Sequence, residues 1–270
     1  MTEVTGDSWL KAFPVVPLSE GQRLDVRPED ILEGGLYRLC HTYRGGGGYD
    51  QFPRIAEERG LGAGHNLQFV VQLRGCSLDC PYCYVTRAGV WGTSVRKTVA
   101  ELVEAFRQTD ATVFHLMGGA PAFHMDKWLA LCDWLNCLPP TRNWVFHSDL
   151  LLTEFAYPRH VLERLPRRCL LAVDIKGLDA EEYLRNTRKA FGPARMFANL
   201  DVLDETQAPY YLTFTNVSAE NQAQFWEVFE KNWPASYTYQ RRDALSIDLV
   251  SYQALVHVDD IPWGGLKVLA

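Results

Sequence analysis

The sequence predicts an α/β fold, a partial (β/α)6 TIM-like barrel preceded by an N-terminal extension. From residue 66 onward, short runs rich in β-branched and aromatic residues alternate with amphipathic segments. This alternation is typical of parallel strands joined by right-handed helical crossovers. About six strand–helix units fit into about 186 residues, whereas a closed eight-stranded barrel takes roughly 250 residues. An open barrel of six strands therefore suits the count better.

Six β-rich runs are the expected strands. The first is at about 67–74 and continues into a cysteine-containing loop that extends to about 92. The next four are expected at 112–117, 144–148, 169–176 and 210–215. The last is either 237–241 or 246–251, and we favour 246–251. In such a sheet, ligands collect at the carboxyl ends of the strands, so the residues that follow each strand are the candidates for function.

The amphipathic segments between the strands are the expected helices. Thr93 and Ser94 offer an N-cap to a helix near 95–108, whose apolar residues recur at helical spacing. The other helices are expected near 125–137, 159–165, 180–191 and 220–233. Cys132 and Cys137 lie in an apolar helix-like run, and we interpret both as packing residues.

The first 65 residues differ from the rest in containing several prolines and the glycine run Gly45–Gly48. No Lys-Ser/Thr pair follows these glycines, so a phosphate-binding loop is not indicated. We interpret residues 1–65 as an N-terminal extension with short helices around 52–60, which covers one end of the main domain or recognises substrate. Residues 66–255 are the expected barrel domain, and residues 256–270 are a C-terminal tail.

The composition excludes several classes of protein. With 47% hydrophobic and 22% charged residues, the chain has the composition of an ordinary globular protein. The net charge of -6 predicts no nucleic-acid partner, and basic runs such as Arg185–Lys189 are interpreted as solvated faces. No apolar run reaches the ~20 residues of a membrane span, and no secretory signal is visible. Seven cysteines, three of them clustered, argue against a disulfide framework, so we expect a cytoplasmic protein.

The clustered cysteines follow the first expected strand. Cys76, Cys80 and Cys83 are spaced C-x3-C-x2-C. Because a [4Fe-4S] cluster normally takes four thiolates, three close thiolates can hold one and leave one iron open. Half of a zinc site would need a second ligand pair of similar spacing, and none of the other cysteines forms one. A thioredoxin-type redox pair would explain Cys80 and Cys83 but not Cys76. The spacing favours the cluster over zinc and over coincidence.

This loop resembles the signature of the radical S-adenosylmethionine (SAM) enzymes, C-x3-C-x-aromatic-C, in which the aromatic residue, here Tyr82, lies beside the adenine. The resemblance implies that Cys76, Cys80 and Cys83 bind a [4Fe-4S] cluster. It also implies that the amino and carboxylate groups of SAM chelate the fourth iron. The reduced cluster then cleaves SAM to a 5′-deoxyadenosyl radical. The open six-stranded barrel that the strand count favours is the fold of that family.

A second segment extends the resemblance. Gly118, Gly119, Ala120 and Pro121 follow the second expected strand and resemble the family's Gly-Gly-Glu-Pro turn, whose backbone accepts the ammonium group of SAM. Ala120 departs from the pattern, so the carboxylate is missing or is supplied by another residue such as Asp149. The alternative is a plain strand-to-helix turn.

Asp174 and Lys176 close the fourth expected strand. They resemble the Asp-Leu-Lys strand of the glycyl-radical-enzyme activases, in which the two residues reach the ribose and the carboxylate of SAM. Alternation along a strand predicts that both side chains lie on the same face. The alternative is a buried ion pair at the mouth of the barrel.

The remaining strand ends match the family less well. Ser148, with His147 or Asp149, stands where the family contacts the cofactor's carboxylate. After the fifth strand, Asn216 is the only polar candidate. His115, in the middle of the second strand, is interpreted as a satisfied core histidine rather than a catalytic one.

The sequence therefore predicts an oxidoreductase-type radical SAM enzyme whose radical abstracts hydrogen from a substrate. An electron donor such as flavodoxin or ferredoxin is expected as its partner. The non-standard Ala120 and the N-terminal extension favour tailoring of a small molecule or peptide. One alternative is an activase that installs a glycyl radical on a partner enzyme. Another, from a different class, is a non-enzymatic zinc or iron–sulfur binding module.

Overall fold

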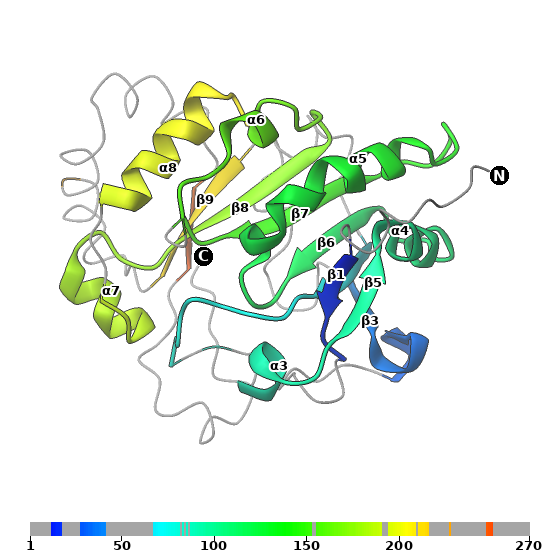
Figure 1. Cartoon of the computed structure of the whole chain (residues 1–270), viewed down its shortest axis with the longest axis horizontal. Coiled ribbons are helices and arrows are strands. Elements are labelled where there is room, and N and C mark those ends of the chain that lie inside the picture. Colours follow the sequence, from blue (N-terminus) through cyan, green and yellow to red (C-terminus); the bar gives the residue numbers. More distant parts are fainter. Residues whose placement is uncertain are drawn as a thin grey trace.

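The structure is a computed structural model that describes residues 12–17, 28–41, 67–81, 83, 85, 87–152, 155–190, 194–208, 210–215, 227 and 247–250. In these residues the main sheet has eight strands in the order β10-β9-β8-β7-β6-β4-β3-β2 (Figure 1). The strands are β2 (Ile31–Leu32), β3 (Tyr37–His41), β4 (Leu67–Gln72), β6 (Val113–Met117), β7 (Val145–Leu150), β8 (Cys169–Ile175), β9 (Tyr210–Thr215) and β10 (Ile247–Val250).

Six of these strands form the predicted barrel segment. From β4 to β10, each strand pairs in parallel with the next one along the main sheet, in chain order. The sheet ends at β10 on one side and β2 on the other, so no closed barrel is formed by the described residues. The prediction of an α/β partial barrel is confirmed, and the last strand is the favoured candidate at 246–251.

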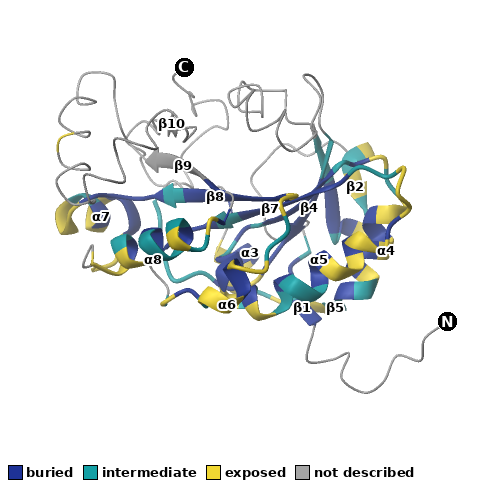
Figure 2. Cartoon of the chain, turned by 90° about the horizontal axis from the view of Figure 1, so that it is seen from above, coloured by how far each residue is buried: buried dark blue, intermediate teal, exposed yellow. Residues whose placement is uncertain are grey.

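The helices are α3 (Arg87–Trp91), α4 (Val99–Arg107), α5 (Trp128–Asn136), α6 (Arg159–Leu162), α7 (Ala180–Thr187) and α8 (Ala194–Glu205), with a 3-10 segment at Pro121–Lys127. Figure 2 shows α4, α5, α6 and α8 on one side of the sheet. Helix α8 was not expected, and the expected helix at 220–233 lies outside the described residues apart from residue 227. None of the helices in the described ranges is both long enough and apolar enough to cross a membrane.

The predicted start of the first helix is wrong. Residues 95–98 form strand β5 (Val95–Thr98), which pairs antiparallel with β1 (Ala12–Val15). Helix α4 begins after Thr98, whose side chain accepts a hydrogen bond from the Glu101 backbone N–H, while the Glu101 carboxylate accepts one from the Thr98 N–H. This capping box satisfies two amide groups at the helix start. Pairing with a distant segment overrides the helical spacing of the preceding residues.

The described parts of residues 1–65 add strands around the barrel segment. Strand β3 pairs antiparallel with β4, and β2 pairs antiparallel with β3. The expected short helices around 52–60 and the glycine run Gly45–Gly48 lie outside the described residues. The division at residue 65 and the tail at 256–270 stay predictions.

The two faces of the main sheet differ in chemistry. One face, called the outer face here, packs Phe69, Phe114 and Phe146 against aromatic residues of α4 and α5. Because side chains alternate along a strand, the neighbouring residues lie on the opposite, inner face. That inner face carries a set of polar residues from four adjacent strands: Arg38, Gln68, Gln72, His115, His147 and Asp149. Apolar packing on the outer face holds the helices in place. The polar side chains of the inner face are therefore available to form a binding site.

Candidate functional site

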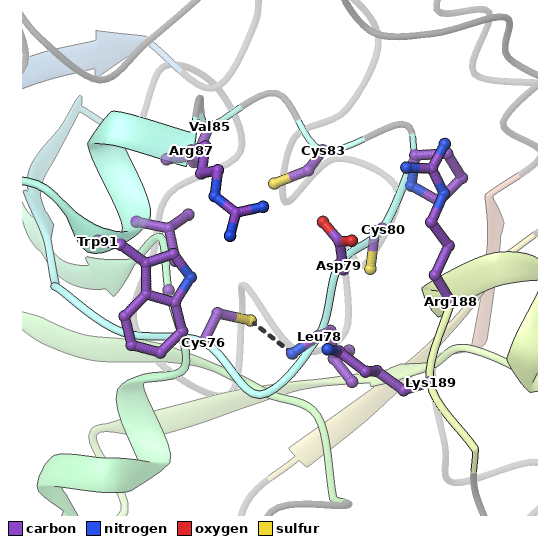
Figure 3. A pocket seen from close by; sticks show the side chains of 13 residues that line it. Cys76, Leu78, Asp79, Cys80, Cys83, Val85, Arg87, Trp91, Arg188 and Lys189 are labelled. Atoms are coloured by element: carbon purple, nitrogen blue, oxygen red, sulfur yellow. Dashed lines mark hydrogen bonds between the residues drawn. The ribbon is translucent and has the colours of Figure 1, made fainter.

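The three clustered cysteines lie around one cavity at the carboxyl end of β4. Cys76, Cys80 and Cys83 are half-buried and line a cavity of about 370 Å³ (Figure 3). The Leu78 N–H donates to the Cys76 sulfur over 3.4 Å, and the Cys83 N–H donates to the Cys80 carbonyl over 3.1 Å. The structure therefore brings together the three cysteines that the sequence singled out.

Two contacts with other elements hold the cysteine loop. The Asp79 N–H donates to the Thr187 carbonyl at the end of α7 over 3.0 Å, and the Gly75 N–H donates to the Val90 carbonyl of α3 over 2.7 Å. Helix α7 ends in a left-handed residue, Arg188, with φ of 55°. The loop is thus fixed by backbone hydrogen bonds to two neighbouring helices.

The glycine turn after β6 touches the start of the cysteine loop. Gly118 and Gly119 have φ values of 69° and 57°, a region that residues with a Cβ disfavour. The Ala120 N–H donates to the Gly75 carbonyl over 2.6 Å, and Gly119 lines the cysteine cavity. Ala120 is fully buried and brings no carboxylate. The predicted turn is therefore in contact with the predicted cluster loop.

Asp174 and Lys176 form an ion pair at the end of β8. Lys176 is buried, and its carbonyl accepts a hydrogen bond from the Asn186 side chain over 2.6 Å. The expectation that both side chains share a face is confirmed. The alternative was a buried ion pair, and the contacts show an ion pair in which Lys176 is buried and Asp174 is partly exposed. An ion pair of this kind is compatible with a role in binding SAM.

The residues at the end of β7 are split between the two faces. Ser148 is fully buried, and its hydroxyl donates to the Asp149 carbonyl over 3.3 Å. By alternation it lies on the opposite face from His147 and Asp149, so the structure does not bring it to the inner face with them. Tyr82 and Asn216 lie outside the described residues.

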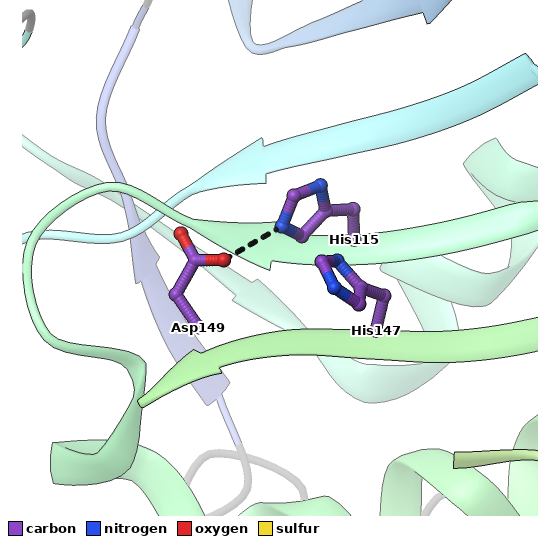
Figure 4. A group of neighbouring side chains, drawn as sticks. All are labelled: His115, His147 and Asp149. Carbon is purple, nitrogen blue, oxygen red and sulfur yellow. Dashed lines mark hydrogen bonds and ion pairs between the residues drawn. The ribbon is translucent and has the colours of Figure 1, made fainter. Parts of the chain in front are cut away.

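Two histidines and Asp149 form a polar cluster on the inner face (Figure 4). The His115 Nδ1 lies 2.5 Å from the Gln68 Oε1, and its Nε2 lies 3.2 Å from the Asp149 Oδ1. The rings of His115 and His147 have centroids 4.1 Å apart. Two causes lower the pKa of His147 well below its usual value: burial is the larger, and the electrostatic effect of the neighbouring His115 is the smaller. The imidazole of His147 is therefore neutral. Both ring nitrogens of His115 therefore have a polar neighbour, and these neighbours lie on the polar inner face of the sheet rather than in the apolar core.

Sequence reasoning missed Arg38. This residue of β3 is buried, and by strand register it is in the same row as Val70 and His115. Its Nη2 lies 3.3 Å from the Met117 sulfur, and its Nε has no hydrogen-bond partner among the described residues. No sequence signal marks it, because only the antiparallel pairing of β3 brings it to the sheet. A buried guanidinium of this kind is suited to an anion.

A protein-family sequence model, described as "Radical SAM superfamily", matches residues 70–231 of the chain. The chain belongs to this superfamily. Radical SAM enzymes use a [4Fe-4S] cluster and SAM, and these are the cofactors of this enzyme.

Similar solved structures have low sequence identity. SuiB of Streptococcus suis has a TM-score of 0.50 and 11% identity, over 82% of this chain and 45% of that chain. TYW1 with a lysine-pyruvate adduct bound has a TM-score of 0.50 and 11% identity, over 77% of this chain and 72% of the TYW1 chain. Native anSMEcpe with bound AdoMet has a TM-score of 0.48 and 12% identity, over 67% of this chain and 49% of the anSMEcpe chain. The chain spans about half the length of the SuiB and anSMEcpe chains that it matches, and no curated protein sequence matches. At this identity the likeness shows the shared fold alone.

The charges around the cysteine cavity fit a radical SAM cluster. Arg87, Arg188 and Lys189 line the cavity, with Asp79 as the acidic side chain among the lining residues. Three thiolates concentrate negative charge, which nearby cations stabilise. Arg185, Arg188 and Lys189 are exposed, as the interpretation of a solvated face predicted, and the end of α7 also places Arg188 and Lys189 at the edge of the cavity. The residues present therefore fit the cofactor.

Proposed function

We propose that this radical SAM enzyme tailors a small molecule or a peptide, with Cys76, Cys80 and Cys83 as the ligands of its cluster. The observation that carries the proposal is the position of three thiols around one cavity that Gly119 also lines. When bound, the cluster supplies the electron that cleaves SAM to methionine and a 5′-deoxyadenosyl radical. The chain's own part is to hold and orient the cofactors.

The roles of the other residues follow from their positions at the strand ends. The backbone of Gly118 and Gly119 receives the ammonium group of SAM, because glycine allows close approach. Asp174 and Lys176 bind the ribose and the carboxylate of SAM. Arg87 and Arg188 lower the free energy of the negative charge at the cysteine loop. Flavodoxin or ferredoxin is the proposed electron donor.

The tailoring role is preferred to the activase role for two reasons. Ala120 replaces the usual glutamate, which indicates a specialised site. Arg38, from the N-terminal segment, lies on the inner face and suits an anionic group of a substrate or of SAM.

A peptide-modifying enzyme with a second cluster is disfavoured by the positions of three other cysteines. Cys132 and Cys169 are buried together with their sulfurs 3.7 Å apart, and Cys137 is exposed at the end of α5. They therefore do not gather around a second cavity at the sheet's carboxyl end. The expectation that Cys137 packs in the core was wrong.

Anaerobic reconstitution tests the proposal. The enzyme is expected to bind about four iron atoms per chain and, after reduction by dithionite, to form 5′-deoxyadenosine and methionine from SAM. Chromatography with mass spectrometry measures both products. The zinc-module alternative gives one zinc per chain and no cleavage, and that result would refute the proposal.

Replacing Asp174 with asparagine is expected to weaken SAM binding. The amide keeps the shape but removes the charge that pairs with Lys176, and a hydrogen bond to a charged group contributes about 1.5–3 kcal/mol. The Kd for SAM should rise about tenfold or more, as measured by calorimetry on the cluster-loaded enzyme. Asp133→Asn, at an exposed position of α5, is the control and should leave the Kd unchanged. Equal affinities of D174N and the unmodified enzyme would exclude Asp174 from the SAM site.

A further inference from the structure

We propose that His115, His147 and Asp149 form a second metal site, which binds one divalent transition-metal ion of the iron or manganese type on the inner face of the sheet. The ligand atoms of these three side chains all lie within 4.8 Å of one another. Two histidines and one carboxylate are the ligand set of mononuclear non-haem iron sites, which leave coordination positions open. This site uses none of the cysteines.

The strand register creates the cluster. His115 of β6 and His147 of β7 are direct partners in the parallel ladder. Asp149 follows His147 by two residues and therefore lies on the same face of β7. Three ligands thus come from two rigid, adjacent strands. Sites on such elements are held more accurately than sites on loops.

The distances suit ligands that share one ion. With metal–ligand bonds of about 2.1 Å, two neighbouring ligand atoms of an ion lie about 3 Å apart. The separation of the His115 Nε2 and the Asp149 Oδ1 is 3.2 Å. Two imidazoles bound side by side to one ion have ring centroids about 4.5–5.3 Å apart by the same geometry, and those of His115 and His147 are slightly closer, 4.1 Å apart. An ion fits the cluster with only small side-chain rotations.

The partner of the other His115 nitrogen supports the same assignment. The Gln68 Oε1 lies 2.5 Å from His115 Nδ1 and, as an oxygen, accepts a hydrogen bond from it, so in an imidazole with one N–H the Nε2 lone pair faces the Asp149 carboxylate. Two acceptors in contact need a cation or an extra proton between them. Metal-binding histidines almost always donate their second N–H in this way. A metal ion between them resolves the contact.

One side of the site is open. The Asp149 side chain is 35% exposed, while both histidines are buried. The ion therefore keeps positions for water or for a substrate oxygen on the inner face. There it acts as a Lewis acid that orients the substrate without itself exchanging electrons. A substrate with a carboxylate or hydroxyl group fits this site.

Manganese binding tests the proposal on the cluster-loaded enzyme. Mn²⁺ is the probe because it prefers nitrogen and oxygen ligands to thiolates, so the cysteine loop does not compete. Loss of the free Mn²⁺ signal in electron paramagnetic resonance counts the bound ions. We expect one ion per chain, with couplings to two imidazole nitrogens in the pulsed spectrum. Binding without nitrogen couplings, or no binding, overturns the proposal.

Variants locate the ion. Asp149→Asn and His115→Ala remove a ligand, and Gln68→Met removes the hydrogen bond to His115 Nδ1 while leaving all three ligands. Loss of such an outer partner costs about 10–100-fold in metal affinity, so each variant should weaken Mn²⁺ binding at least tenfold. His160→Ala, at an exposed position of α6, is the control and should bind as before.

The outcomes of these variants decide whether the ion is bound by this cluster. If H115A fails to fold, D149N and Q68M decide. Unchanged affinity in both means that these side chains do not hold the ion, which overturns the proposal. Because the readout is metal binding, it stands or fails independently of SAM cleavage.

Discussion

Replacing Cys80 with alanine is expected to abolish both the brown chromophore and the formation of 5′-deoxyadenosine. The unmodified chain offers three thiolates around one cavity. With one removed, only two corners of the cluster have a protein ligand, and a [4Fe-4S] cluster normally takes four ligands. Iron should fall from about four atoms per chain to the level of a protein without a site. Iron analysis and visible absorption after anaerobic reconstitution measure the loss.

Cys137→Ala is the matched control for this experiment. Cys137 is exposed, and its thiol donates to the Asp133 carbonyl over 3.3 Å. Its replacement should leave iron content and SAM cleavage unchanged. A Cys80 variant that keeps its cluster and its cleavage activity would show that the loop is not the cluster site. The superfamily assignment would then require the ligands to lie elsewhere in the chain.

Replacing Gly119 with alanine is expected to lower both stability and SAM cleavage. A Cβ at this position would lie 2.6 Å from the Leu73 carbonyl oxygen and closer still to that of Gly75. Both are backbone atoms at the start of the cysteine loop, so the loop has to move. Strain from the left-handed backbone and from overpacking together cost about 2–5 kcal/mol. Because a displacement of about 1 Å can reduce catalysis about 100-fold, cleavage should fall by that order.

Gly34→Ala separates strain from displacement of the loop. Gly34 has φ of 64°, close to that of Gly119, but a Cβ there meets nothing within 4 Å among the described residues. It should cost only the left-handed strain, about 1–2 kcal/mol, and should leave SAM cleavage intact. Urea unfolding gives the free energy of unfolding for both variants. Equal losses of stability, with cleavage retained in both, would mean that the glycine turn does not position the cysteine loop.

The barrel strands and the cysteine loop could be predicted from local sequence patterns. Runs such as 169–176 begin with several consecutive apolar residues, and they begin and end within about two residues of the observed strands. The C-x3-C-x2-C spacing is also local, because three thiols within eight residues are kept close by the chain itself. The Gly-Gly turn after β6 was visible for the same reason. These features depend on neighbouring residues and need no knowledge of distant contacts.

Contacts between segments that are distant in the sequence decided the features that local patterns did not predict. Residues 95–98 have helical spacing but form β5, because β1 from the start of the chain supplies hydrogen-bond partners. The guanidinium group of Arg38 comes to the inner face only through the pairing of β3 with β4. Arg188 and Lys189 are exposed, as the sequence pattern indicated, but only the fold places them beside the cysteine cavity, at the end of α7.

By itself, the sequence determined the order of the strands and the chemistry at their ends, because alternation and spacing act over a few residues. Only the tertiary structure decided which face each side chain takes. A shift of one residue in register would exchange the faces of Ser148 and Asp149. The parallel register of β6 and β7 is therefore what brings His115, His147 and Asp149 together.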